Sequence, residues 1–175
     1  MFNLANGQRA ERKLLITVAE WLDGSNQPVR ELLGTRTPDS SIEYNPEIET
    51  STDILGNNYT DVNKTQPQQQ FDPHLILGGA KLAEKLDDIR RRNAISEVNQ
   101  FTLYIITAYK GSADDGYPAE KHTDCTITYD SLGGESNVNF PITAYFSNKI
   151  TLGKVNKLAD DFEFTPDSTT TTTTT

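Results

Sequence analysis

The chain has 175 residues, two histidines, one cysteine and a formal net charge of −9, a size typical of one domain with its own core. The pI near 4.7 argues against a protein that wraps nucleic acid, because such binding needs lysine and arginine to displace the counterions of the phosphates. The single cysteine, Cys125, excludes an internal disulfide and a cysteine-rich zinc site.

Hydrophobic residues make up 35% of the chain, and its mean hydropathy is −0.58. This polarity predicts long surface segments, or segments that become buried only against partner chains. The chain has no apolar stretch long enough to span a bilayer, and its first residues lack a basic region followed by an apolar one. We therefore expect synthesis in the cytoplasm and no membrane partner.

The first predicted element covers residues 12–22, whose pattern fits a strand or a helix, and its content of Val, Ile and Thr favours the strand. Turn-forming residues at 23–26 end it. Two extended runs, about 41–53 and 59–71, then flank a turn at 55–58 and predict a long hairpin over about 41–72. The returning run is polar on both faces, so we expect it to lie against solvent, a lumen or a neighbouring subunit.

The ascending run of this hairpin is polar or acidic at every second position from Ser41 to Asp53, and the intervening positions are mostly apolar or β-branched. An extended strand would segregate these two sets onto opposite faces. One face would then carry the carboxylates of Glu43, Glu47, Glu49 and Asp53. Residues 38–77 hold seven acidic residues and one lysine, a net of −6. An outer face in solvent explains such a charge run, and the lining of a passage for a polyanion explains it as well.

A helix is predicted over residues 79–93, where Leu82, Leu86 and Ile89 form an apolar stripe at helical spacing. Asp87 with Arg91 and Asp88 with Arg92 have the favourable i,i+4 offset, and Asn93 can end the helix. Further strands are predicted over 101–109, 125–129 and 138–146. The fold class is therefore mainly β with one α-helix (α+β), in a single domain over 1–167. Residues 168–175, Ser and seven Thr, are expected to form a flexible tail or a linker.

An enzyme is not expected. His74 and His122 are the only histidines, and His122-Thr123-Asp124-Cys125 places three reactive side chain types close together. In a strand, however, His122 and Asp124 would share one face and Cys125 would point the other way. No phosphate-binding glycine loop or metal-ligand spacing accompanies them, so we predict no catalytic residue, cofactor or metal.

The run SIEYNPEIETSTDILGNNYTDVNKTQP at 41–67, with FDP at 71–73, LAEKL at 82–86 and VNFPI at 138–142, resembles the major tail (tail tube) proteins of long-tailed, siphovirus-like bacteriophages of Gram-positive hosts. The resemblance extends over roughly residues 38–152. It rests on short stretches of similar sequence and on the order of the predicted elements. It includes no catalytic signature, and the amino-terminal 37 residues and the threonine tail match less clearly.

This resemblance implies a β-sandwich or small barrel flanked by a helix, which assembles as hexameric rings that stack into a hollow tube. The long hairpin would contribute to a β-barrel shared between subunits, because closure of a barrel removes exposed strand edges. The hairpin residues expected between subunits are Tyr44, Ile48, Ile54, Tyr59 and Val62. The implied partners are further copies of the chain, a tape measure protein and tail terminator or distal tail proteins, in a virion tail.

In such a tube we expect Glu43, Glu47, Glu49 and Asp53 to face the lumen. Phosphates that pass within a Debye length of about 8 Å would meet a wall that offers no counterion release, so DNA would slide without being trapped. Two alternatives stay open: a monomeric Ig-like or carbohydrate-binding β-sandwich on a surface, and a tube protein of a contractile tail, a phage-like bacteriocin or a gene transfer agent.

Overall fold

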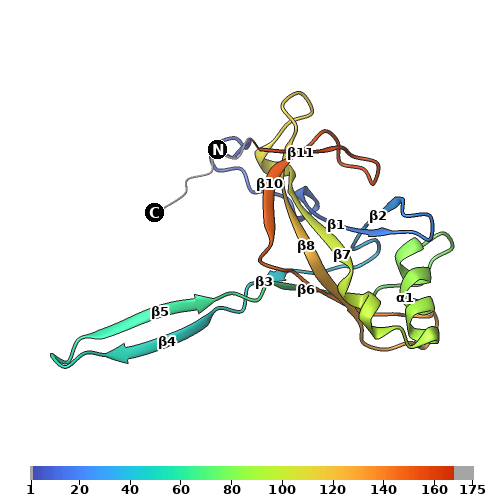
Figure 1. Ribbon diagram of the computed structural model, residues 1–175. Helices are drawn as coiled ribbons and strands as arrows, with labels where there is room; N and C mark the ends of the chain where they lie inside the picture. Colours follow the sequence, from blue (N-terminus) through green and yellow to red (C-terminus); the bar gives the residue numbers. More distant parts are fainter. Residues whose placement is uncertain (1, 168–175) are drawn as a thin grey trace.

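A computed structural model describes residues 2–167, in which a curved sheet and one helix form a body and a two-stranded hairpin extends away from it (Figure 1). The strands are β1 (Leu15–Leu22), β2 (Pro28–Leu32), β3 (Ile42–Glu43), β4 (Glu47–Thr52), β5 (Asn58–Lys64), β6 (Gln68–Phe71), β7 (Phe101–Thr107), β8 (Tyr117–Tyr129), β9 (Ile142–Tyr145), β10 (Ile150–Val155) and β11 (Phe164–Pro166). The helix is α1 (Lys81–Arg92), and three short 3-10 helices are η1 (Arg12–Leu14), η2 (Ile95–Asn99) and η3 (Ala108–Lys110). The predicted α+β class is confirmed, and the predicted threonine tail lies outside the described residues.

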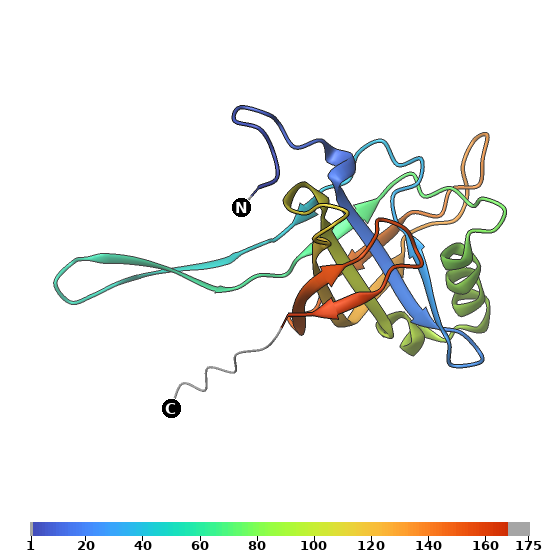
Figure 2. The ribbon, with the colours of Figure 1, turned by 90° about the horizontal axis from the view of Figure 1, so that it is seen from above.

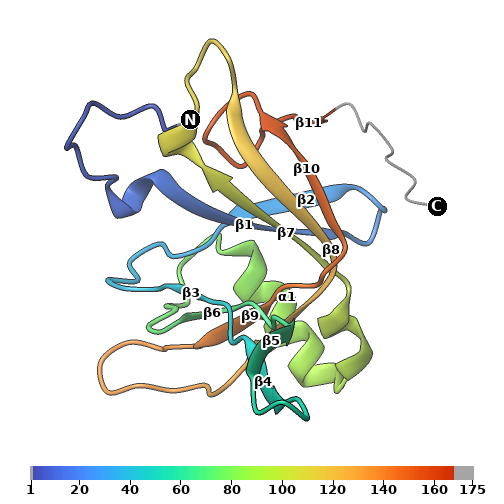
Figure 3. The ribbon, with the colours of Figure 1, turned by 90° about the vertical axis from the view of Figure 1, so that its left-hand side faces the viewer.

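Strand β8 organises the body because it pairs along both of its edges. Its first half pairs with β7 on one side and β10 on the other, and its second half pairs with β9. The resulting order is β2-β1-β7-β8-β9-β6-β3, with β10 and β11 branching from β8. Asp124 has a positive φ of 55° where the register of β8 shifts, so a bulge bends the strand. The sheet thereby curves over itself, as the views from above and from the side of the hairpin show (Figures 2 and 3).

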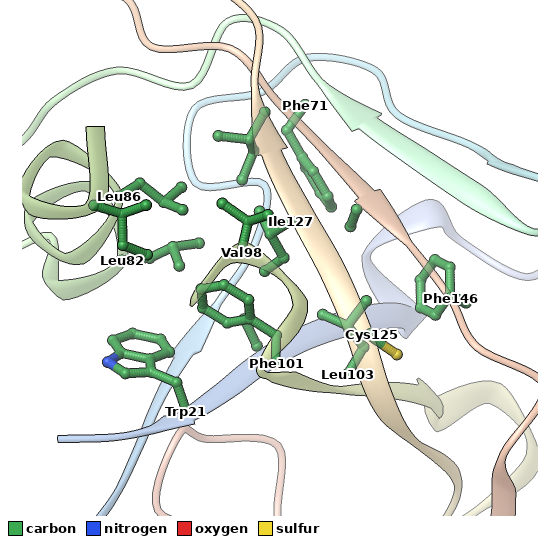
Figure 4. Packing of buried hydrophobic residues seen from close by; sticks show 14 of the residues in the cluster. Trp21, Phe71, Leu82, Leu86, Val98, Phe101, Leu103, Cys125, Ile127 and Phe146 are labelled. Carbon is green, nitrogen blue, oxygen red and sulfur yellow. The ribbon is translucent and has the colours of Figure 1, made fainter. Parts of the chain in front are cut away.

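The main core lies inside this curve. Side chains from β1, β6, β7, β8 and β9 meet the apolar face of α1 there, with Trp21, Phe101 and Ile127 beside Leu82 and Leu86 (Figure 4). Leu82, Leu86 and Ile89 are all fully buried. A second cluster, which includes Tyr104 and Phe162, covers the opposite face of β1, β7 and β8. Strands β1 and β7 are therefore buried on both faces.

Helix α1 is held at both ends by specific contacts. Asn93 adopts the left-handed conformation and ends the helix as predicted. At the start, Ala80 supplies no side-chain cap, and the carboxylate of Glu31 on β2 instead accepts the Leu82 amide hydrogen at 2.9 Å. On the surface Asp88 pairs with Arg92 as predicted, whereas Asp87 pairs with Arg90, not with Arg91.

Several predicted strands have different bounds. The strand predicted over 125–129 is the long β8, because its first half is held between two neighbours. The strand predicted over 138–146 shortens to β9, because the Asn139 side chain binds the His74 amide and Pro141 supplies no amide donor. Strands β2, β10 and β11 were not predicted. Residues 12–22 form a strand from Leu15 onward, after a 3-10 turn.

Candidate assembly interface

The β4–β5 hairpin forms a sheet of its own, separate from the sheet of the body. Every residue in both strands is exposed, and Figure 1 shows the hairpin reaching far from the rest of the molecule. An isolated two-stranded hairpin is only marginally stable in water, and its outer edges carry unpaired backbone groups. A hairpin built in this way is suited to pairing with another chain.

The register divides the hairpin side chains into two faces. Ile48 lies opposite Val62 and Thr50 opposite Thr60, so one face is uncharged and mostly β-branched. The other face carries Glu49 opposite Asp61 and Ser51 opposite Tyr59. Glu47 belongs to the acidic face by alternation, and it pairs with Lys64 at 3.2 Å beside a bulge. The alternation seen in the sequence therefore corresponds to two chemically different faces.

Asp53 lies in the turn after β4, and not in the predicted strand. Its Oδ1 accepts the amide hydrogens of Leu55 and Asn57 at 2.8 and 2.9 Å, and its Oδ2 accepts hydrogen bonds from the Asn57 amide group and the Tyr59 hydroxyl, both at 2.9 Å. These bonds, chiefly those from Asn57, stabilise the anion and lower the pKa of Asp53 to about 2. The charge at the hairpin tip is therefore fixed by the turn itself.

The long strand predicted over 41–53 is interrupted at its centre. Asn45 has a positive φ of 42°, and residues 44–46 separate β3 from β4. The returning run is likewise divided into β5 and β6. The Gln66 amide donates to the Tyr44 carbonyl at 2.9 Å, so the two arms of the hairpin stay paired across the break. Pro46 and Pro67, which supply no amide donors, lie in the two interrupted segments.

Glu43 lies on the body, on the outer side of the sheet formed by β3, β6 and β9. The Gln68 side chain donates to its carboxylate at 3.4 Å. Glu43 is one of the residues that line a groove of about 450 Å³. This groove has acidic and uncharged polar walls: Asp39, Ser40, Ser41, Glu43, Gln68, Gln70, Asp72, Asp130, Thr143 and Tyr145. An acidic surface thus exists on the body as well as on the hairpin.

The structure therefore distributes the four predicted lumen carboxylates over three places: Glu43 on the body, Glu47 and Glu49 on β4, and Asp53 in the turn. Asp61, which was not among the predicted lumen carboxylates, lies opposite Glu49. The turn Asp53 to Asn57, once recognised, would have set the register and revealed this pair.

The five hairpin residues expected between subunits also lie on different surfaces of the hairpin. Ile48 and Val62 share the uncharged face, and Ile54 is fully exposed at the tip. Tyr59 lies on the acidic face and binds Asp53. Tyr44 lies in the break between β3 and β4. Its partial burial is the larger cause of its raised pKa, and the nearby charge of Glu120 is a smaller one.

The side chains considered for catalysis are structural. The bulge at Asp124 alters the alternation of β8, so His122 and Cys125 are both buried, contrary to the expectation that they face opposite ways. Burial raises the pKa of the Cys125 thiol, which keeps it from being a thiolate nucleophile. Asp124 instead pairs with Lys149 on the surface at 2.5 Å. Among residues 2–167, no group of three or more His, Cys, Asp or Glu side chains is arranged to hold a metal ion.

No protein-family model matches this chain, and no curated protein matches its sequence. Solved structures that are similar to it include three cryo-EM structures. A chain of the anti-feeding prophage baseplate, a cryo-EM structure with six-fold symmetrisation, has a TM-score of 0.47 and 11% identity over 89% of this chain and 100% of that one. The cap that terminates the tube of the anti-feeding prophage has a TM-score of 0.47 and 12% identity over 86% of this chain and 95% of that one.

The third is the extended sheath-tube complex of an extracellular contractile injection system, PVC, with a TM-score of 0.42 and 12% identity over 79% of this chain and 88% of that one. In the part of the chain that the structure describes, no helix is long and apolar enough to cross a membrane.

Proposed function

We propose that this protein is a structural subunit of a phage-like tail tube, in which copies form hexameric rings that stack around a channel for DNA. The observation that carries this proposal is the free-standing hairpin, whose strands are exposed along their whole length. Such a hairpin gains stability when its edges pair with neighbouring copies, and pairing around a ring closes a barrel without exposed edges. The sequence resemblance to tail tube proteins supports the same assignment.

The two faces of the hairpin suit such a barrel wall. The face with Ile48 and Val62 packs outward against protein, and the face with Glu47, Glu49 and Asp61 lines the channel. The carboxylates repel the phosphates of passing DNA, and the basic side chain of the hairpin, Lys64, is already paired with Glu47 at 3.2 Å. The protein has no enzymatic role in this proposal. Its partners are its own copies, a tape measure protein and the terminator and distal proteins of a virion tail, contractile or non-contractile.

Electron microscopy of the purified full chain tests the assembly. We expect rings or tubes with a central channel and six-fold symmetry in top views. A chain that stays a monodisperse monomer at every concentration would overturn the proposal, and binding of that monomer to glycans on an array would favour a carbohydrate-binding surface module.

The channel assignment is tested by reversing charge. We expect tubes of the variant Glu47→Lys with Glu49→Lys to bind a short fluorescent DNA duplex at low salt, with binding that weakens as salt rises. The matched control, Asp114→Lys with Glu135→Lys, makes the same change of charge in exposed loops of the body. Equal binding by the two sets of tubes would contradict a channel lined by the hairpin.

A further inference from the structure

Two hairpins of this chain, β1–β2 and β4–β5, are closed by turns of the same type. In the β1–β2 turn, Asp23 Oδ1 accepts the amide hydrogens of Ser25 and Gln27, and the Asp23 amide donates to the Gln27 carbonyl. In the β4–β5 turn, Asp53 makes the equivalent bonds to Leu55 and Asn57. The fourth position has a positive φ in both turns, 57° at Asn26 and 84° at Gly56. The two turns thus have one backbone design.

The turns differ in the two residues at their tips. The β1–β2 turn carries Gly24 and Ser25, which are small and polar, whereas the β4–β5 turn carries Ile54 and Leu55. The apolar pair is 102% and 81% exposed. Because the first turn folds in the same way with Gly and Ser, turn geometry does not require large apolar side chains at these positions. Ile54 and Leu55 are therefore explained by a contact outside their own turn.

The hairpin carries this apolar tip away from its own body (Figure 1), so another molecule must receive it. The surface of the body holds a pocket of about 440 Å³ between η1, the end of β2 and the segment that leads to β3. Its apolar walls are Leu15, Ile16, Leu32, Leu33 and Pro38. Arg12, Lys13 and Asp39 also line it, so basic side chains outnumber acidic ones there.

The hairpin that presents the tip has the complementary charge. Asp53 lies next to Ile54, so the tip itself brings a carboxylate to the pocket. Lys13 is largely exposed and its only ion pair in the described structure is with Glu11, at 2.6 Å, so its ammonium group can also approach an incoming carboxylate. The Arg12 guanidinium donates to the carbonyls of Ser40 and Leu15 and thereby fixes one wall of the pocket.

We propose that the Ile54–Leu55 tip of one copy inserts into this pocket of a second copy. The inference rests on the proposed function and adds the contact surface to it. Because the tip and the pocket are different surfaces, the contact is head-to-tail, and repeated contacts of this kind generate a closed ring or a helical filament.

The first experiment replaces the tip with the residues of the other turn. We expect Ile54→Gly with Leu55→Ser to keep the folded body and to raise the concentration needed for assembly by about 100-fold, because two large apolar side chains lose their burial. Sedimentation velocity over a concentration series measures this shift. The control is Ile95→Ser, which removes an exposed apolar side chain from η2. An unchanged midpoint for the tip variant would overturn the proposal.

The second experiment tests the pocket directly. Leu55→Cys and Thr35→Cys are made in separate proteins, mixed at equal concentration and oxidised mildly. Thr35 is an exposed residue of the pocket wall, and the native Cys125 is only 1% exposed, so it does not compete. We expect a disulfide-linked pair in the mixture and none in either protein alone.

The outcomes separate the two proposals. Tubes that form without the Leu55→Cys to Thr35→Cys crosslink, or a Leu55→Cys protein that links only to itself, would overturn the tip contact and leave the tube function standing. A wild-type chain that stays a monomer at every concentration would overturn both.

Discussion

Asp61 lies directly opposite Glu49 across the β4–β5 hairpin, so two carboxylates of like charge share one position of the ladder. Like charges at opposed positions destabilise an antiparallel pair. The side-chain amide of Asn63, whose Nδ2 donates to Glu49 Oε2 at 3.0 Å, offsets part of this repulsion. Within the isolated subunit the acidic face therefore weakens the hairpin that carries it, which is consistent with a face selected for its charge.

We expect Asp61→Asn to slow backbone hydrogen exchange across residues 47–64 by about twofold to fivefold, because one of the two opposed charges is removed. Exchange monitored by mass spectrometry measures the effect on the monomer. The thermal unfolding of the body should not change. Asp114→Asn, a charge removal in an exposed loop, is the control, and equal protection in both variants would contradict the expected repulsion.

Asp53 should keep the hairpin tip ordered until strongly acidic pH. Its pKa is lowered to about 2 in the folded chain, against about 3.9 for an unperturbed Asp, so the stabilisation is present above the higher value and is lost as pH falls through the lower one. We expect the Leu55 and Asn57 amide resonances to stay in place at pH 4 and to shift toward disordered positions near pH 2. Asp53→Ala should show the disordered positions already at pH 7.

The hairpin illustrates what the sequence can and cannot predict. The alternation over Glu47 to Thr52 correctly separates an acidic face from an uncharged one, because side chains of a strand alternate by geometry alone. The break at Asn45 escaped prediction, since Asn enters the left-handed region only where its surroundings favour it. The partnership of Glu49 with Asp61 depends on the register, which is set by the turn.

The body shows the same division. The α1 stripe is predictable because its spacing is local, and Leu82 and Leu86 are buried. The Glu31 cap joins residues from β2 and α1 that are 51 positions apart, and no periodicity predicts such a contact. The bulge at Asp124 likewise changed the orientation expected for Cys125, since one extra residue in a strand alters every later side-chain direction. The pocket proposed to receive the hairpin tip is assembled from residues 12–16 and 32–40. No local pattern in the sequence predicts that these two segments meet.

Glu31 should contribute to stability through the α1 amino terminus. Its carboxylate accepts the Leu82 amide hydrogen and lies at the positive end of the helix dipole. We expect Glu31→Ala to lower the free energy of unfolding by about 1 kcal/mol, measured by urea titration. Glu31→Gln, which keeps an acceptor oxygen, should lose less. Glu84→Ala, which removes an exposed carboxylate in the first turn, is the control, and an equal loss there would contradict the capping role.

His74 should make the body less stable in mild acid. Burial lowers its pKa below the usual 6.5, although its Nδ1 donates to the Phe140 carbonyl at 3.2 Å. The unfolded chain then binds a proton at His74 more readily than the folded chain, so stability is present above about pH 6.5 and declines as pH falls below it. We expect the Tm of the wild type to fall between pH 7.5 and pH 5.5. His74→Gln keeps a donor near Phe140 without the titrating ring, so its Tm should fall less over the same interval. Parallel Tm curves for the two proteins would show that another group controls the acid response.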